Sequence, residues 1–277
     1  MPVSDLLVEG DLDNTILTAV LKGRPTVKAG GTKTALKPRA EDERRQRKVT
    51  VCYIRDRDFD FDPPDDRSRP EPHTRVQGGG AEVLGWYWCR HEMESYLLEP
   101  AIVVRAIGCD EANYREALTG AARRIRDYQA ARGAIGFTRR SLPPSFKFQT
   151  LPDEIPDDSL RLPADLSPEA VSSWARDQAS RFRDRLCPQL DPAAIQQVID
   201  QRRARLSEEI LSSPAEILVW FSGKDLMSAL GPWLALQGVA PPGAFRARLR
   251  DWVRENPEET VSFLPEWGSF IAMLNAG

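Results

Sequence analysis

The chain has 277 residues, of which 41% are hydrophobic and 29% charged, enough for one large domain or two small ones around a substantial core. Its net charge of -3 excludes a uniformly basic surface for nucleic acid, although local basic patches remain compatible with it. No apolar run approaches the roughly 20 residues of a membrane span and no leader-like segment precedes the first expected strand, so we expect a cytoplasmic protein without a membrane partner.

The first half of the chain alternates expected strands with expected helices. Short apolar runs predict buried strands at residues 6–8, 26–28, 49–54 and 83–88. Apolar residues recur at helical spacing over 12–22, and the charged stretch 33–48 is typical of a helix or a charged connector. This β-α-β-α-β order predicts the α/β fold class, with a parallel, Rossmann-like sheet and crossover helices.

The second half is expected to be nearly all helix. A helix is predicted over 113–132, followed by a proline-rich joint over 142–168. Further helices are expected at 168–186, 192–212, 224–237, 242–255 and near Phe270. We therefore predict two domains, an α/β domain over 1–110 and a mostly helical region over 111–277.

The stretch LLVEGDLDNTIL, residues 6–17, carries two competing active-site signatures. Beginning at Asp11, DLDNT resembles the nucleophile loop of haloacid-dehalogenase-type phosphatases. In that family the nucleophile directly follows a strand, whereas Glu9 and Gly10 intervene here, and no later apolar strand ends in a pair of acids. The second signature begins at Glu9, which ends the strand, and Asp13 then lies in the first turn of the next helix. Asp13 could be a functional acid or could only interact favourably with the helix dipole.

A second group of acids follows the clearest strand, VTVCYI, in the sequence RDRDFDFD. Asp56 and Asp58 are two positions apart, so in an extended chain their carboxylates are expected to face the same side. Parallel strands end at the same edge of a sheet, so Glu9 should converge on them there. Carboxylates this close repel one another, and a hard divalent cation, Mg²⁺ or Mn²⁺, would relieve that repulsion.

These elements together resemble a Toprim domain, with E-G-x-x-D and D-x-D on successive expected strands. CRHEMESYLLEP, residues 89–100, resembles the glutamate-rich motif of Toprim domains in the OLD (overcoming lysogenization defect) nuclease group. WFSGKDLMSAL, residues 220–230, resembles the late G-K-x-L segment of that group. The resemblance adds Glu92 and Glu94 to the metal ligands, with one of them expected to face away, and nominates Lys224 as a catalytic lysine.

What the resemblance implies is a Mg²⁺-dependent nuclease that cuts phosphodiester bonds of tRNA or DNA. Glu9 would bind metal or act as general base, with Asp13, Asp56 and Asp58 as further ligands and Lys224 offsetting charge in the transition state. The chain is most similar to stand-alone Toprim effectors of anti-phage systems such as PARIS, which work with an ABC-type ATPase partner. The helical half would suit docking on that partner or on a second copy of the chain.

Basic residues outside these motifs are candidates for phosphate contacts. The nominated arginines are Arg123, Arg124, Arg139 and Arg140, which could equally be solvated helix faces. His91 lies beside the acids and is as compatible with a surface position as with catalysis. Two alternatives remain beside the nuclease: a non-catalytic interaction subunit with a vestigial metal site, and the phosphatase that would use Asp11.

Overall fold

The computed structural model describes residues 2–77, 80–141 and 191–275, together with 173, 176–177, 180–181, 183–184 and 186–189. The chain forms two compact units, one of residues 1–129 with 206–277 and the other of residues 130–205. The sequence predicted a boundary at residue 110 between a catalytic domain and a helical region, and this boundary stays a prediction. The expected proline-rich joint lies outside the described residues.

A five-stranded sheet is the framework of the first unit. Its strands are β1 (Asp5–Val8), β2 (Thr26–Ala29), β3 (Val51–Arg55), β4 (Glu71–Gln77) and β5 (Gly80–Tyr87). They lie in the order β2-β1-β3-β5-β4, and all neighbours are parallel except β4 and β5. The four expected strands are present, so the predicted α/β class with a mostly parallel sheet is confirmed.

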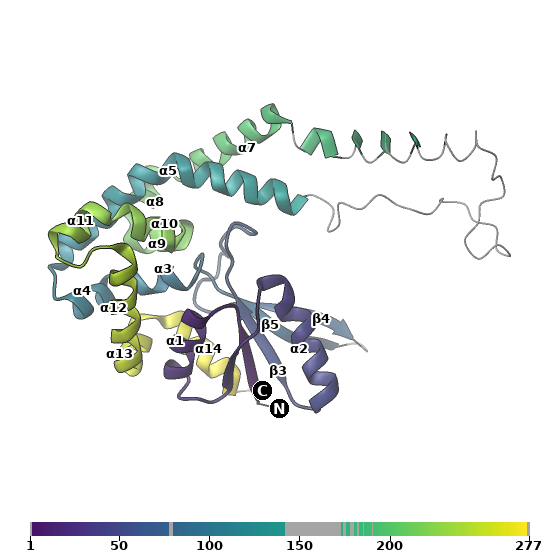
Figure 1. Ribbon diagram of the computed structural model, residues 1–277, viewed down its shortest axis with the longest axis horizontal. Helices are drawn as coiled ribbons and strands as arrows, with labels where there is room; N and C mark the ends of the chain where they lie inside the picture. Colours follow the sequence, from purple (N-terminus) through teal and green to yellow (C-terminus); the bar gives the residue numbers. More distant parts are fainter. Residues whose placement is uncertain are drawn as a thin grey trace. The chain divides into compact units, whose positions relative to one another are not determined.

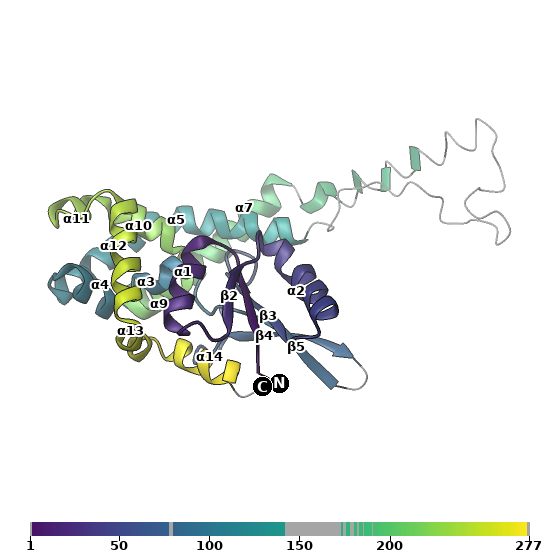
Figure 2. The ribbon, with the colours of Figure 1, turned by 60° about the horizontal axis from the view of Figure 1, so that its bottom comes forward.

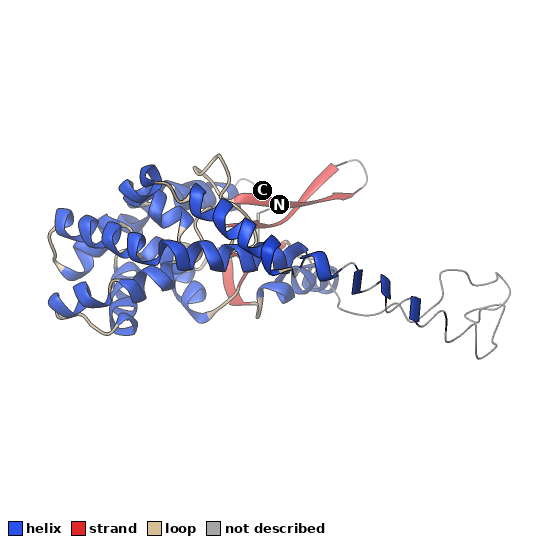
Figure 3. Ribbon diagram, turned by 90° about the horizontal axis from the view of Figure 1, so that it is seen from above, coloured by secondary structure: helices blue, strands red, loops and turns tan. Residues whose placement is uncertain are grey.

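Strand β4 was not predicted from the sequence. It forms an antiparallel hairpin with β5, visible as adjacent red arrows in Figure 3. The strand lies at the edge of the sheet, contains Pro72, and leaves Val76 83% exposed. Edge strands have no buried apolar face to repeat with period two, and proline is tolerated in them, so no hydrophobic pattern indicated this one.

Helices cover both faces of the sheet. Helices α1 (Asp11–Val20) and α14 (Pro265–Asn275) lie on one side and α2 (Lys33–Arg47) on the other (Figures 1 and 2). The α2 side is a core of apolar side chains that includes Leu7, Leu36, Tyr53 and Leu84. On the α1 side, Phe270 of α14 packs edge-on against Trp86 and Trp88. The central strands β1 and β3 are thus buried on both faces, as their continuous apolar runs indicated.

The remaining described helices follow the sheet in sequence. In the first unit they are α3 (Met93–Leu97), α4 (Pro100–Ile107), the first part of α5 (Glu111–Ser141), α8 (Glu208–Ser212), α9 (Pro214–Trp220), α10 (Gly223–Ala229), α11 (Gly231–Leu236), α12 (Pro242–Glu255) and α13 (Pro257–Phe263). The second unit contains the end of α5, a 3₁₀ turn η1 (Cys187–Gln189) and α7 (Pro192–Arg205). In place of the single helix expected over 192–212 the structure has two, α7 and α8. Most of the helix expected over 168–186 lies outside the described residues. None of the described helices combines the length and apolar character that crossing a membrane requires.

Helix α12 has a central place among these helices. Pro242 lies in its first turn, where a fixed φ favours helix initiation, and Phe245, Leu249 and Val253 form its buried stripe. It packs against α1, α3, α4, α10, α11 and α13. Because α1, α3 and α10 carry sequence-predicted site residues, α12 sets how these residues approach one another.

Candidate metal centre

The predicted acidic residues follow the carboxyl ends of three neighbouring parallel strands. Glu9 directly follows β1, Asp56 directly follows β3, and the segment after β5 leads through Glu92 into α3. Strand β3 pairs in parallel with both β1 and β5. The three strands therefore end at the same edge of the sheet, where open α/β sheets place their sites.

Glu9 and Asp56 are in direct contact at this edge. The backbone N–H of Asp56 donates to Oε1 of Glu9 at 3.1 Å. Burial raises the pKa of Glu9 to about 7, and the nearby carboxylate of Asp58 acts in the same direction against the lowering effect of that hydrogen bond. The expected convergence of β1 and β3 on one carboxylate pair is therefore present in the structure.

Asp56 is a buried acid of the group, with one oxygen unpartnered within the described part of the chain. Only 8% of the residue is exposed, and its Oδ1 has no hydrogen-bond partner among the described residues. Burial, followed by the carboxylates of Asp13 and Glu9, holds its pKa well above the usual range. A buried carboxylate oxygen without a partner is costly in a protein interior, unless a cation or a proton joins it.

Asp13 joins the group from the first turn of α1. Burial raises its pKa to about 6, and the carboxylate of Glu94 raises it as well, against the lowering effect of backbone N–H groups at the helix start. A role limited to the helix dipole would lower this pKa. Its environment is therefore that of a member of the acidic cluster.

Glu92 and Glu94 both face Lys224, which corrects the expectation that one of them faces away. They are 4% and 3% exposed. The ammonium of Lys224 lies 2.6 Å from Oε2 of Glu92 and 3.3 Å from Oε2 of Glu94. Although burial lowers the pKa of Lys224, the two carboxylates outweigh it and raise this pKa. Segments far apart in the chain thus meet as expected from the resemblance.

Glu92 also receives two hydrogen bonds from the start of α10. The hydroxyl of Ser222 donates to its Oε1 at 2.7 Å, and the backbone N–H of Lys224 donates to the same oxygen at 2.9 Å. Arg246 of α12 binds Oε1 of Glu94 at 3.1 Å. Sequence reasoning nominated neither residue: Ser222 lies in the quoted segment 220–230, but only Lys224 was singled out there, and Arg246 lies outside the quoted motifs.

Gly223 makes the approach of α10 to α3 possible. A Cβ atom at this position would lie 2.3 Å from the backbone nitrogen of Ser95 and 2.5 Å from the carbonyl carbon of Glu94. No side chain fits there without moving one of the two backbones. A glycine is therefore required on steric grounds before Lys224, because it lets α10 come close enough for Lys224 to reach the two glutamates.

Asp58 adopts a geometry that differs from the predicted one. It has φ +50, so the chain turns here after β3 and the expectation of an extended chain is wrong, although the carboxylate of Asp58 still raises the pKa of both Glu9 and Asp56. Oδ2 of Asp58 lies 2.6 Å from the ammonium of Lys33, which also binds Asp60. Lys33 was not predicted, and it brings a second lysine to the edge of the cluster.

His91 is buried beside the acids and only 2% exposed, so the surface alternative for it is wrong. The ligand atoms of Asp58, His91 and Glu92 lie within 4.8 Å of one another. The backbone N–H of Asp58 donates to the carbonyl of His91 at 2.8 Å, which joins the two loops. These residues could share a cation with mixed oxygen and nitrogen ligands.

Arg57, between the two aspartates, holds the surrounding loops together. It is 5% exposed and donates to the carbonyls of Cys89 at 3.2 Å, Val219 at 2.6 Å and Phe61. These carbonyls belong to the segment after β5, to α9 and to the turn after β3. Sequence reasoning missed Arg57, because a charged residue between two acids gives no signal that it is buried.

The chemistry of this donor set fits a hard divalent cation. Carboxylate oxygens dominate it, and Mg²⁺ and Mn²⁺ prefer such ligands. The orphaned Oδ1 of Asp56 is the atom that most requires a positive partner. The residues that could hold one or two cations are Glu9, Asp13, Asp56, Asp58, His91, Glu92 and Glu94.

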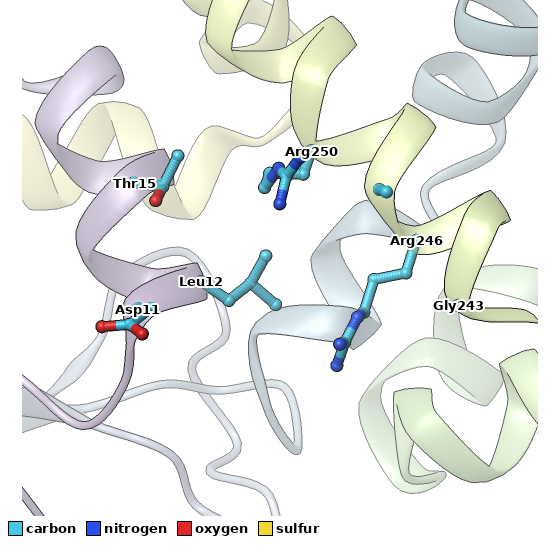
Figure 4. A pocket seen from close by; sticks show the side chains of 7 residues that line it. Asp11, Leu12, Thr15, Gly243, Arg246 and Arg250 are labelled. Carbon is cyan, nitrogen blue, oxygen red and sulfur yellow. The ribbon is translucent and has the colours of Figure 1, made fainter.

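Other predicted residues have different surroundings. Asp11, the nucleophile of the phosphatase alternative, is exposed at the start of α1 and lines a cavity with Arg246 and Arg250 of α12 (Figure 4). Arg123 is exposed and pairs with Glu208 at 3.1 Å, and Arg124 is also exposed. Arg140 is exposed in the second unit, and the side chain of Arg139 lies outside the description. Contacts of these arginines with nucleic acid stay a prediction.

No protein-family model matches this chain, and no curated protein does.

Proposed function

We propose that the chain is a Toprim-type, Mg²⁺- or Mn²⁺-dependent nuclease that hydrolyses phosphodiester bonds in tRNA or DNA. Two independent features support the proposal. The four quoted motifs occur in the order that the resemblance requires, and their acidic residues and Lys224 meet at one edge of a parallel sheet.

The observation that carries the proposal is the buried carboxylate of Asp56. Its Oδ1 has no partner among the described residues, and burial, followed by the carboxylates of Asp13 and Glu9, keeps its pKa high. A buried carboxylate of this kind opposes folding unless a cation or a proton joins it, and a divalent cation would compensate it together with the neighbouring acids. Perturbed carboxylates gathered at the strand ends are typical of a functional site.

The roles of the residues follow from their surroundings. A bound divalent cation would supply a water of lowered pKa and positive charge next to the phosphate. Oε1 of Glu9 accepts the N–H of Asp56, so Oε2 is the oxygen open to a metal or to a proton from the attacking water. The side chain of Lys224 is 54% exposed, and its ammonium would balance negative charge that develops on the phosphate.

The biological setting comes from the resemblance alone. A toxic effector that cuts tRNA or invading DNA would be held inactive by an ABC-type ATPase and released on infection. A gene for such an ATPase next to the gene for this chain would support this setting, and co-purification of the two proteins would test it.

The nuclease proposal is tested by incubating the purified protein with Mn²⁺ and either plasmid DNA or total tRNA. We expect cleavage that EDTA abolishes and that Asp56→Asn and Glu9→Ala each reduce by at least a factor of about 100. Asp65→Asn is the matched control, because Asp65 is exposed in the loop that follows the same strand. Equal cleavage by wild type and Asp56→Asn would exclude this site.

A second candidate, the non-catalytic interaction subunit, is favoured by one observation. Lys33 and Lys224 already form ion pairs with Asp58, Glu92 and Glu94, so part of the negative charge is balanced without a metal. Under this alternative Mn²⁺ would neither bind nor stabilise the protein. A thermal melt with and without Mn²⁺ therefore separates the two functions even before a substrate is known.

A further inference from the structure

A cavity of about 200 Å³ opens between α1 and α12, next to the acidic cluster. Its lining includes Leu12 and Thr15 of α1 and the side chains of Arg246 and Arg250 of α12. Figure 4 shows both arginines on the α12 side of this space, across from Leu12 and Thr15. Positions four apart on a helix lie on the same face, so the two guanidinium groups are neighbours along one wall.

The cavity is joined to the candidate metal centre through Arg246. Its Nη1 binds Oε1 of Glu94 at 3.1 Å, while its Nε and Nη2 have no hydrogen-bond partner among the described residues. The side chain is 47% exposed, so these donors are accessible from solvent. One end of Arg246 thus contacts the acidic cluster, and its remaining N–H groups are open to a ligand.

Arg250 brings a second positive charge to the same wall. Its only partner among the described residues is the neighbouring Asp251, bound through Nε at 3.0 Å and Nη2 at 2.8 Å. The one acid in the cavity lining is Asp11, which is exposed at the start of α1. The cavity is therefore lined by two arginines and one exposed carboxylate, and Glu94 and Asp251 pair with the two arginines from outside the lining.

We infer that this cavity binds a backbone phosphate of the nucleic acid, adjacent to the phosphate held at the metal centre. The inference rests on the proposed nuclease function and names Arg246 and Arg250 as substrate-binding residues. Guanidinium groups present paired N–H donors that match phosphate oxygens, and here they lie beside the carboxylates that would position the scissile phosphate. The hydroxyl of Thr15 is a further donor on the opposite wall.

The test compares Arg250→Gln with Arg254→Gln. Both arginines pair with Asp251 and both lie on α12, but Arg254 does not line the cavity. Binding of a fluorescent 12-nucleotide single-stranded DNA, and of RNA with the same sequence, is measured by anisotropy at several KCl concentrations. Ca²⁺ replaces Mn²⁺ so that the probe is not cut.

We expect Arg250→Gln to weaken binding by about 5- to 10-fold and to lower the slope of log affinity against log salt by about 0.7, the loss of one phosphate contact. Arg254→Gln should stay within about twofold of wild type. Equal losses in the two variants, or no binding by the wild type, would overturn the inference. Thermal melts of both variants check that each is folded.

Failure of the inference is distinguishable from failure of the nuclease proposal. If Arg250→Gln binds like wild type while Mn²⁺-dependent cleavage still requires Asp56, the function stands and this phosphate site does not exist. If wild type cleaves nothing but Arg250→Gln selectively loses binding, the phosphate site stands and the catalytic proposal is wrong.

Discussion

Lys224 binds Glu92 at both of its oxygens although the two residues are 132 positions apart. The backbone N–H of Lys224 donates to Oε1 at 2.9 Å, and its ammonium lies 2.6 Å from Oε2. Hydrogen bonds to an ionised partner are stronger than neutral ones, so this pair joins α10 firmly to the segment after β5. It also places a positive charge where the proposed chemistry requires one.

Replacing Lys224 by Met should reduce Mn²⁺-dependent cleavage by about 100-fold or more, the loss typical of removing one group that stabilises transition-state charge. Lys224→Arg, which keeps the charge, should retain more activity than Lys224→Met. Cleavage rates of the three proteins, measured at saturating Mn²⁺, decide this. Full activity in Lys224→Met would show that the lysine only balances Glu92 and Glu94.

Asp56→Asn should have opposite effects on stability without and with metal. In EDTA at pH 8 we expect the variant to be more stable than wild type by about 1–3 kcal/mol, because it removes a buried carboxyl group whose ionisation is unfavourable and whose Oδ1 has no partner among the described residues. Mn²⁺ at about 100 times its dissociation constant should stabilise wild type by about 2.7 kcal/mol and the variant much less. Urea unfolding under both conditions measures these differences, and a variant that responds to Mn²⁺ like wild type would contradict the assignment.

Gly223→Ala should destabilise the protein by about 1–3 kcal/mol, the usual cost of forcing an added methyl into a filled space. The new Cβ would lie 2.3 Å from the backbone nitrogen of Ser95, so α10 or α3 must move. The control is Gly231→Ala at the start of α11, where a Cβ meets nothing within 4 Å. Denaturant midpoints of the two variants give the comparison, and equal midpoints would exclude the steric explanation.

The dependence of stability on pH should include a contribution from Asp5, which is 4% exposed at the start of β1. Burial raises its pKa, but hydrogen bonds from Lys28 and Arg47 outweigh this, and the net pKa is lowered. A carboxylate whose pKa is lower in the folded state stabilises the protein above the unfolded pKa of about 3.9, and this stabilisation is lost as the pH falls through the folded value.

Asp5→Asn should therefore cost about 1–3 kcal/mol at pH 7, where the charge-assisted hydrogen bonds of the wild type are intact. The difference between variant and wild type should shrink towards zero as the pH is lowered to about 2. Unfolding by urea at a series of pH values measures it. A difference that does not change with pH would mean that Asp5 acts through its shape and not through its charge.

Some features of the fold were predictable because they depend on local patterns. VTVCYI and the other apolar runs indicated buried parallel strands, and β1, β3 and β5 are such strands. Strand β4 was not, because an edge strand that pairs on one side and exposes Val76 needs no hydrophobic pattern. The single helix expected over 192–212 missed the break between α7 and α8, since helix boundaries leave weaker signals than helix interiors.

The turn after β3 illustrates a limit of reasoning from spacing. Asp56 and Asp58 were expected to face the same side, which holds only while the chain stays extended. The positive φ of Asp58 turns the chain and directs this carboxylate to Lys33 on α2. This conformation is supported by contacts of Asp58 with His91 and Lys33, which belong to other segments of the chain. A rule based on local spacing cannot anticipate such contacts.

By itself, the sequence determined that acidic residues follow buried parallel strands, because apolar runs mark the strands and the α/β order directs their ends to one edge. Only the tertiary structure decided which charges balance one another there. Lys33 pairs with Asp58 across 25 positions and Arg246 with Glu94 across 152. Such contacts depend on how α2 and α12 pack, just as the pairing of Lys224 with the glutamates depends on the close approach of α10 to α3 that Gly223 permits. No periodicity within a segment records the packing between segments.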